Sequence, residues 1–236
     1  MTEVFGQNSV FAIYVNGIRM SKNQCHLLYY LNTLFHIKRI LCALCARNSG
    51  DIMAVKVKVE NVVASTQIDK IISLDKLLTI MEASEYEPEQ FPGLVYRLDN
   101  PKVATLIFRS GKIICVGARS TAAAKEALEI VVRKIKKIGL RVDETKLKVK
   151  IENIVVSIDL GAELNLDQLA FQLEDSEYEP EQFPGLVYRI PDPKVAFLLF
   201  SSGRVVCAGA KSLAAVKDAV EKLEKKLREL KVKLPK

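Results

Sequence analysis

The chain has 236 residues, and its 49% of hydrophobic residues is ordinary for a globular protein. A formal charge of +7 favours a polyanionic partner without establishing one, because many proteins of similar charge bind no nucleic acid. The five cysteines are an odd number without framework spacing, which argues against a disulfide scaffold and for a reducing compartment.

The first 53 residues differ in composition from the rest of the chain. Residues 25–46 are apolar but contain two histidines, an asparagine, a lysine and an arginine, so they make a poor membrane span. We expect residues 1–53 to be a poorly ordered extension, or to precede a true start at Met53. A zinc site here is disfavoured by the irregular spacing and apolar setting of its candidate ligands. These ligands are Cys42, Cys45, His26 and His36.

An internal repeat organises the remainder. The fourteen residues SEYEPEQFPGLVYR occur at 84–97 and again at 176–189, and the same offset of 92 relates the flanking sequence over about 55–230. Two copies are too few for a solenoid and predict one pseudo-symmetric unit. We therefore predict a first repeat over 54–145 and a second over 146–236.

Each copy begins with a strand and a short helix. Apolar and polar residues alternate at the start of each copy, which is typical of a half-buried strand. The two predicted strands are 55–63 and 147–156. Ser73 and Asn165 are suitable N-caps for the helices that follow. The two predicted helices are 74–82 and 166–174.

Further strands and a long helix complete each copy. Three of these strands read GLVYRL, VATLIF and KIICVGA in the first copy and GLVYRI, VAFLLF and RVVCAGA in the second. Ser-Gly pairs at 110–111 and 202–203 predict hairpin turns. The long helices are amphipathic, and each follows a serine N-cap, Ser120 before 121–138 and Ser212 before 213–230; Gly139 ends the first. The predicted order is strand, helix, four strands and helix, in duplicate, which is an α+β fold.

One feature departs from a plain α+β domain. In residues 103–108 and 113–116 both alternating sets of side chains are apolar. Two long helices can cover only one face of a sheet, so the second face is either an exposed binding surface or is buried by other structure. A helix layer on both faces and a homodimer through the sheet are the alternatives that the pattern leaves open.

At these residues the chain resembles the TATA-binding protein family. The resemblance covers about residues 54–230 and rests on motifs present in both copies: EN(V/I)V, YEPEQFPG, PKVAxLxF, and CxGAR or CxGAK. It implies a saddle of two pseudo-symmetric repeats, whose curved antiparallel sheet carries helices on its convex face. It also implies minor-groove binding of A·T-rich promoter DNA, bending of that DNA, and recruitment of transcription factor B and RNA polymerase.

The resemblance assigns four phenylalanines beside turns as wedges that enter between base steps and kink the duplex. They are Phe91 and Phe108 in the first repeat and Phe183 and Phe200 in the second. From the pattern alone, a phenylalanine that ends an apolar strand is better explained as a core residue. Their placement beside turns in both copies favours the wedge interpretation.

Base and phosphate contacts are also implied. Asn61 and Asn153 match asparagines that donate to the minor-groove acceptors of A·T pairs. The matching apolar floor against sugars and base edges consists of Val63, Leu106, Ile114, Val116, Val155, Leu198, Val206 and Ala208. The matching phosphate-contacting residues, which position the protein without specifying sequence, are Arg97, Lys102, Lys112, Arg119, Arg189, Lys194, Arg204 and Lys211.

The sequence departs from the family pattern at three places. Val116 and Ala208 stand where threonine is common, so a hydroxyl near the central base pairs is missing from both halves. Gln90 stands where eukaryotic members often have a basic residue. Both loops are acidic instead, a symmetry that looks archaeal and leaves orientation on DNA to a partner. The resemblance implies that the second loop docks transcription factor B through Glu179, Glu181 and Gln182.

An enzyme is disfavoured, because it needs a positioned acid, base, nucleophile or metal. The repeat region has no histidine and no glycine loop suited to phosphate, and we expect no cofactor. The alternative that the sequence leaves open is a divergent paralogue of the same fold that acts mainly through protein partners. The resemblance further implies a nucleoid-associated protein of the archaeal cytoplasm without a membrane partner, and it leaves open a weak homodimer of the free protein.

Overall fold

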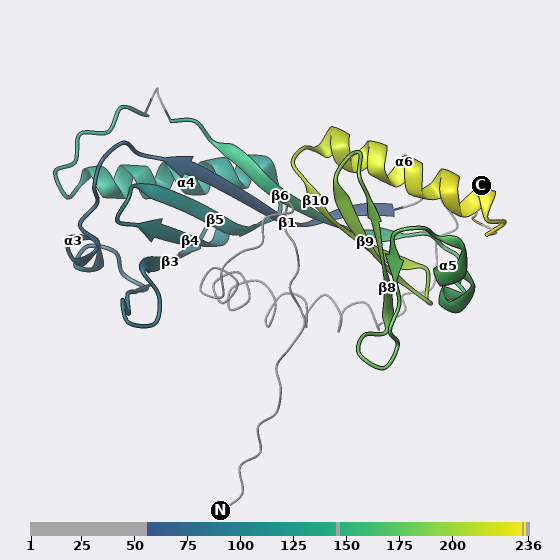
Figure 1. The fold of residues 1–236 in the computed structure, drawn as a ribbon. Coiled ribbons are helices and arrows are strands. Elements are labelled where there is room, and N and C mark those ends of the chain that lie inside the picture. The colour runs from purple at the N-terminus through teal and green to yellow at the C-terminus, as the bar shows by residue number, and fades with distance from the viewer. Residues whose placement is uncertain (1–55, 145–146, 233, 235–236) are drawn as a thin grey trace, which may run out of the picture. The chain divides into compact units, whose positions relative to one another are not determined.

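The computed structural model describes residues 56–144, 147–232 and 234, and the elements below all belong to one compact unit, Gly50–Lys236. The first repeat contains β1 (Lys56–Gln67), α3 (Leu74–Leu78), β2 (Ser84–Glu85), β3 (Gly93–Asp99), β4 (Lys102–Phe108), β5 (Lys112–Ala118) and α4 (Thr121–Lys136). The second contains β6 (Lys150–Asp159), α5 (Leu166–Gln172), β7 (Ser176–Glu177), β8 (Gly185–Ile190), β9 (Val195–Phe200), β10 (Arg204–Ala210) and α6 (Leu213–Glu229). The predicted α+β fold and element order are confirmed (Figure 1).

The ten strands form one antiparallel sheet in the order β2-β3-β4-β5-β1-β6-β10-β9-β8-β7. The two equivalent strands β1 and β6 pair at its centre, from Lys56 opposite Asp159 to Ser65 opposite Lys150. Equivalent strands of the two repeats therefore occur in the same order when the sheet is followed inwards from either edge. Each repeat contributes one half of the sheet, and the strands that carry the repeated phenylalanines lie towards opposite ends.

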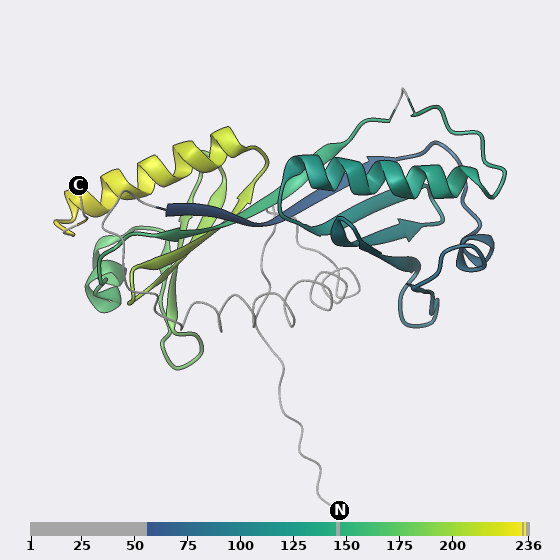
Figure 2. The same ribbon diagram turned by 180° about the vertical axis from the view of Figure 1, so that it is seen from behind.

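Both long helices pack on one face of this sheet (Figure 2). Helix α4 contacts β1, β4 and β5, and α6 contacts β6 and β10. Buried side chains recur every three or four residues along each helix, as expected for an amphipathic helix on a sheet. In α6 they are Val216, Ala219, Val220, Leu223 and Leu227. None of the helices in the described residues is long and apolar enough to cross a membrane.

Some strand boundaries differ from the prediction. Strand β1 continues to Gln67, beyond the predicted end at residue 63, because its last residues pair with β5. The predicted strand 147–156 is displaced along the chain: β6 begins only at Lys150, so residues 147–149 lie outside it, and it continues to Asp159, where it pairs with both β1 and β10. These extensions depend on neighbouring strands, which the local pattern does not reveal.

All four predicted residues occupy N-cap positions, and three of them accept a capping hydrogen bond. The side chains of Ser120, Ser212 and Asn165 accept hydrogen bonds from backbone N–H groups three residues later, at 3.0, 3.1 and 3.0 Å. Ser73 also occupies the predicted N-cap position, before α3, but its side chain makes no capping hydrogen bond. The short helices end earlier than predicted, at Leu78 and Gln172, and the chain turns further on, at Ala83 and Asp175, whose φ angles are +59° and +57°.

Two cysteines lie in the described residues. Cys115 in β5 and Cys207 in β10 are fully buried free thiols, and burial raises the pKa of both to about 12. Within the described segments, no three His, Cys, Asp or Glu side chains are placed to hold a metal ion. The zinc candidates at 26, 36, 42 and 45, and the start considered at Met53, lie outside the described residues.

Candidate nucleic-acid interface

The face of the sheet opposite α4 and α6 has its own apolar layer. Four side chains on it are less than a tenth exposed yet do not belong to the helix-side core, namely Val63 (7%), Leu106 (3%), Val116 (6%) and Val206 (8%). The other four predicted floor residues, Ile114, Val155, Leu198 and Ala208, are half-buried.

Strand register brings the floor residues of each half into cross-strand rows. Leu106 lies opposite Ile114, and Leu198 lies opposite Val206 at the equivalent place. At the centre, Val155 lies opposite both Ala208 and Asn61. The predicted floor residues thus share one surface, and its outermost strands, β4 and β9, end at Phe108 and Phe200.

The four phenylalanines lie outside the core. Phe91 packs edge-to-face against Phe108 with ring centroids 5.6 Å apart, and Phe183 packs in the same way against Phe200 at 5.9 Å. All four are half-buried, whereas Phe197, on the opposite face of β9, is fully buried. The core interpretation that the pattern favours for these residues is therefore wrong.

A glycine makes room for each ring pair. Gly93 lies opposite Phe108 in the ladder and Gly185 lies opposite Phe200. A Cβ atom on Gly185 would lie 2.7 Å from the ring of Phe183 and 3.0 Å from that of Phe200. Each glycine therefore permits a ring pair at the sheet edge, a role that the recurrence of Phe-Pro-Gly in both repeats could have indicated.

The two asparagines are held by backbone bulges at the centre of the sheet. The amide oxygen of Asn61 accepts from the N–H of Gly117 at 2.9 Å, and that of Asn153 accepts from Gly209 at 2.8 Å. Both glycines have positive φ angles, +96° and +111°, in bulges where a strand contains an extra residue. A backbone N–H can donate only to the oxygen of a side-chain amide, so these hydrogen bonds fix the orientation of both amides. Each Oδ1 faces its glycine, and each side-chain NH₂ is the group that can donate to a ligand.

A second set of polar residues crosses the seam between the repeats, and sequence reasoning missed it. Ser157 donates to Glu60 at 2.8 Å, and at the equivalent place Ser65 donates to Glu152 at 2.7 Å. Each glutamate is the extra residue of a bulge in the β1–β6 ladder. The signal was the recurrence of both residue types at the repeat offset.

These two glutamates are ion-paired on their own strands. Lys58 lies 3.0 Å from Glu60, and Lys150 lies 3.1 Å from Glu152. Partial burial raises the pKa of Glu60, but hydrogen bonds from Lys58 and Ser157 and the charges of Lys58 and Arg119 outweigh it, so the pKa lies below its ordinary value. Glu152 behaves in the same way, with Lys112 as its distant cation. Both carboxylates are therefore charged at neutral pH.

The predicted phosphate-contacting residues are distributed equally between the repeats. All are exposed except Arg204, which is half-buried. Arg97 pairs with Glu85 at 3.2 Å, and Arg189 pairs with Glu177 at 3.0 Å, so these two arginines already have carboxylate partners. The loop residues Glu179, Glu181 and Gln182 are all exposed, and Gln182 donates to Glu179.

Comparison with known proteins gives the same twofold division. The family model "Transcription factor TFIID (or TATA-binding protein, TBP)" matches the chain twice, over residues 56–138 and 148–230. The chain belongs to this family. Family members named TATA-box-binding protein include those of Methanocaldococcus jannaschii, 50% identical over 179 residues, and Archaeoglobus fulgidus, 51% identical over 178 residues.

These relatives are covered almost completely by this family member. The matches span 76% and 74% of this chain and 97% and 96% of the two relatives. The solved structure of Methanococcus jannaschii TBP matches with a TM-score of 0.69 at 50% sequence identity, over 74% of this chain and 99% of that chain. The TBP fold and its duplicated domain are thereby confirmed.

The bulge hydrogen bonds generate a test of how this TBP-family sheet holds its central asparagines. Asn153→Ala should lower the free energy of unfolding by about 1 kcal/mol, because the Gly209 N–H loses its acceptor. Asn153→Asp should lower it less, since a carboxylate oxygen can still accept that hydrogen bond. Urea unfolding of both variants measures the difference; equal losses would show that the bulge does not depend on this acceptor.

Proposed function

We propose that the protein binds the TATA box of promoters through the minor groove, bends the DNA, and recruits transcription factor B and RNA polymerase. One observation carries the proposal: two phenylalanine pairs stand outside the core at opposite ends of an apolar sheet face that carries neither long helix. The relatives at about half identity are named TATA-box-binding proteins, which supports the same ligand.

The apolar floor gives a physical reason for A·T preference. In the minor groove an A·T pair offers only acceptors, whereas a G·C pair adds the amino group of guanine. Against side chains such as Leu106 and Val206 that amino group would lose its water without gaining a partner, which costs free energy. The NH₂ groups of Asn61 and Asn153 have the donor chemistry that the acceptors of A·T pairs require.

The phenylalanine pairs provide the wedges for bending. Inserting a ring between base steps costs a few kcal/mol of unstacking, which the extra contact of bent DNA with the sheet offsets. Because these rings lie outside the core, they can enter DNA without opening the hydrophobic layer beneath α4 and α6. Their position at the two ends of the sheet would place one kink at each end of the contacted site.

The cations position the duplex without reading its sequence. Each phosphate contact releases counterions, so the affinity should fall as salt rises. Arg97 and Arg189 would exchange their present carboxylate partners, Glu85 and Glu177, for phosphates. That exchange keeps each arginine charge-paired in both states.

An acidic surface in the second repeat supports docking of transcription factor B. Residues 160–188 contain seven carboxylates and no lysine or arginine, whereas the equivalent residues 68–96 contain six carboxylates and two lysines. All seven carboxylates are exposed, and Glu179 and Glu181 lie among them. Such a surface would repel DNA and attract a basic protein partner, which would orient the nearly symmetric DNA-binding face.

The alternative is a divergent paralogue that acts mainly through protein partners. It is motivated by Val116 and Ala208, which place no hydroxyl beside the central base pairs. In the absence of DNA, the apolar face would instead pack against a second copy of the protein and form a weak homodimer.

DNA selectivity tests the proposal against this alternative. Fluorescence anisotropy of the full chain should give tight binding to a TATA-box duplex, much weaker binding to a G·C-substituted duplex at the same salt, and tighter TATA binding with transcription factor B. Equal weak binding to both duplexes would reject the TATA-binding function and favour the paralogue.

The wedge assignment predicts a separation of bending from encounter. The double variant Phe183→Ala, Phe200→Ala should bend DNA less in a FRET assay with dyes at the duplex ends, while its association rate stays close to that of the parent protein. The reason is that phosphate contacts steer encounter, whereas ring insertion drives the kink. Unchanged bending by this variant would refute the assignment.

The docking assignment has a matched control in the other repeat. Glu179→Ala with Glu181→Ala should weaken binding of transcription factor B to the protein–DNA complex about tenfold, because a charge-complementary contact is lost. The equivalent change in the first loop, Glu87→Ala with Glu89→Ala, should leave it unaltered. Gel-shift titration of the factor measures both, and equal effects in the two loops would contradict docking at the second.

A further inference from the structure

The two halves of the sheet end one hairpin differently. In the first repeat the β3–β4 ladder closes with Asp99 opposite Lys102. In the second repeat the β8–β9 ladder already ends at Ile190 opposite Val195, and the equivalents of that last pair lie in the turn. The residue equivalent to Asp99 is Pro191, which has no N–H to donate to a ladder. The second turn therefore lacks an anchor that the first one has.

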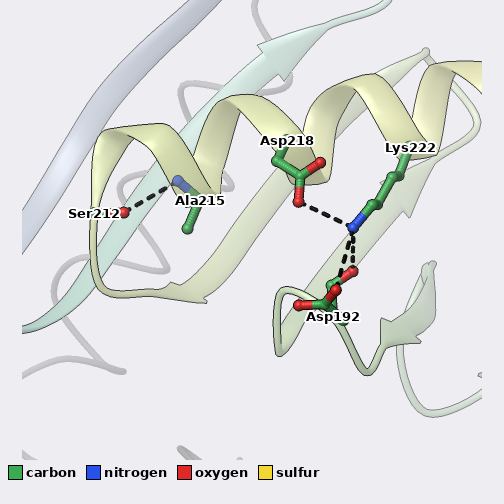
Figure 3. Close-up of polar contacts among 5 residues, drawn as sticks. All are labelled: Asp192, Ser212, Ala215, Asp218 and Lys222. Atoms are coloured by element: carbon green, nitrogen blue, oxygen red, sulfur yellow. Dashed lines mark hydrogen bonds and ion pairs between the residues drawn. The ribbon is translucent and has the colours of Figure 1, made fainter.

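A lysine from α6 reaches this turn. Lys222 donates through Nζ to the carbonyl oxygen of Asp192 at 2.7 Å and to the carboxylate of Asp218 at 2.9 Å. The carboxylate of Asp192 lies 3.6 Å from the same nitrogen (Figure 3). Asp218 lies one helical turn before Lys222, so it orients the lysine from its own helix. The side chain remains 44% exposed, which makes this a surface anchor.

The first repeat has no counterpart to this contact. Ile130 occupies the position equivalent to Lys222, and Asn100 the position equivalent to Asp192. The two turns otherwise share their backbone form, since Asn100–Pro101 and Asp192–Pro193 are both cis. The lysine contact is therefore present where the ladder pair is missing and absent where the ladder pair is present.

The anchored turn leads to the candidate DNA-contacting residues. It contains Lys194, and a Cβ atom on Gly209 would lie 3.1 Å from the Lys194 carbonyl oxygen. The N–H of Gly209 in turn donates to Asn153. In the first repeat, the nearest atom to a Cβ on Gly117 would be the Cα of Val103, at 3.9 Å. The second turn thus packs more closely against the bulge that holds its asparagine.

We infer that Lys222 is a positioning residue that substitutes for the missing ladder pair. It holds the β8–β9 turn, which contains Lys194, as the last pair of the β3–β4 ladder holds Lys102 in the first repeat. The link to DNA rests on the proposed function, because it takes Lys194 to contact phosphate. The anchoring of the turn does not depend on DNA, so the two can be tested separately.

Amide hydrogen exchange of the free full-length protein tests the anchor. Lys222→Ile, which installs the residue of the first repeat, should speed exchange at Asp192 and Lys194 about two- to fivefold, the size expected for a partly exposed ion pair. Lys217→Ala is the matched control, since Lys217 pairs only within α6, with Glu221, among the ion pairs of the described residues. It should leave the turn unchanged.

A rescue variant distinguishes anchoring from a general loss of stability. Adding Pro191→Asp to Lys222→Ile supplies an N–H at the position equivalent to Asp99 and so permits the last ladder pair of the first repeat, and exchange at the turn should return towards the parent rate. Faster exchange throughout the sheet, no change at the turn, or failure of the rescue would each overturn the inference.

A double-mutant cycle on TATA-box DNA tests the consequence. Lys194→Ala should weaken binding severalfold in the parent protein and by a smaller factor in the Lys222→Ile background, because a loosened turn no longer holds the ammonium group in place. Equal factors in both backgrounds would overturn the link from Lys222 to DNA. If Lys194→Ala has no effect in either background, the phosphate contact of the proposed function fails, while the exchange experiment still decides whether Lys222 anchors the turn.

Discussion

The pairing of β1 with β6 is the contact on which the rest of the structure depends. These equivalent strands join the two repeats edge to edge, so that ten strands form one sheet with the repeated features at equivalent positions in its two halves. The pairing is not a regular ladder, because Glu60 and Glu152 each form a bulge and each accepts a hydrogen bond from a serine of the other repeat. The seam is therefore specified by side chains as well as by backbone hydrogen bonds.

The joined sheet has two apolar faces and two long helices, which lie on the same side. The helices therefore cover the apolar side chains of one face, while the second face has a separate apolar layer of Val63, Leu106, Val116 and Val206. In the minor groove an A·T pair presents acceptors and no donor, so an apolar surface meets it without burying an unpaired donor. The asparagines at its centre, each oriented by a bulge glycine, add donors at the position where the two repeats meet.

Much of this could be predicted from the sequence, because the duplication reports every local signal twice. Strand alternation, the caps at Asn165, Ser120 and Ser212, and the hairpin turns depend on neighbouring residues and were predicted correctly. The early ends of the short helices, the missing capping hydrogen bond of Ser73 and the extension of β1 were not predicted; the extension depends on pairing with β5, which is a tertiary contact. The phenylalanines needed the family resemblance, since an apolar strand end alone favours a core position. Their proposed roles at DNA stay predictions, as do those of the cations.

The asymmetry between the repeats follows a physical division. On the face proposed to meet DNA, the phenylalanine pairs, asparagines and bulge glycines are duplicated with nearly equal geometry, as a nearly symmetric minor groove would require. In other respects the repeats differ: the stretch 160–188 lacks the two lysines of its counterpart, and the β8–β9 ladder is one pair shorter than the β3–β4 ladder where Lys222 reaches the turn. Because the Lys222 contact compensates for the missing ladder pair, the face proposed to meet DNA stays similar in the two repeats while the rest of their surfaces differs. Protein partners can therefore distinguish two halves that DNA meets as near equals.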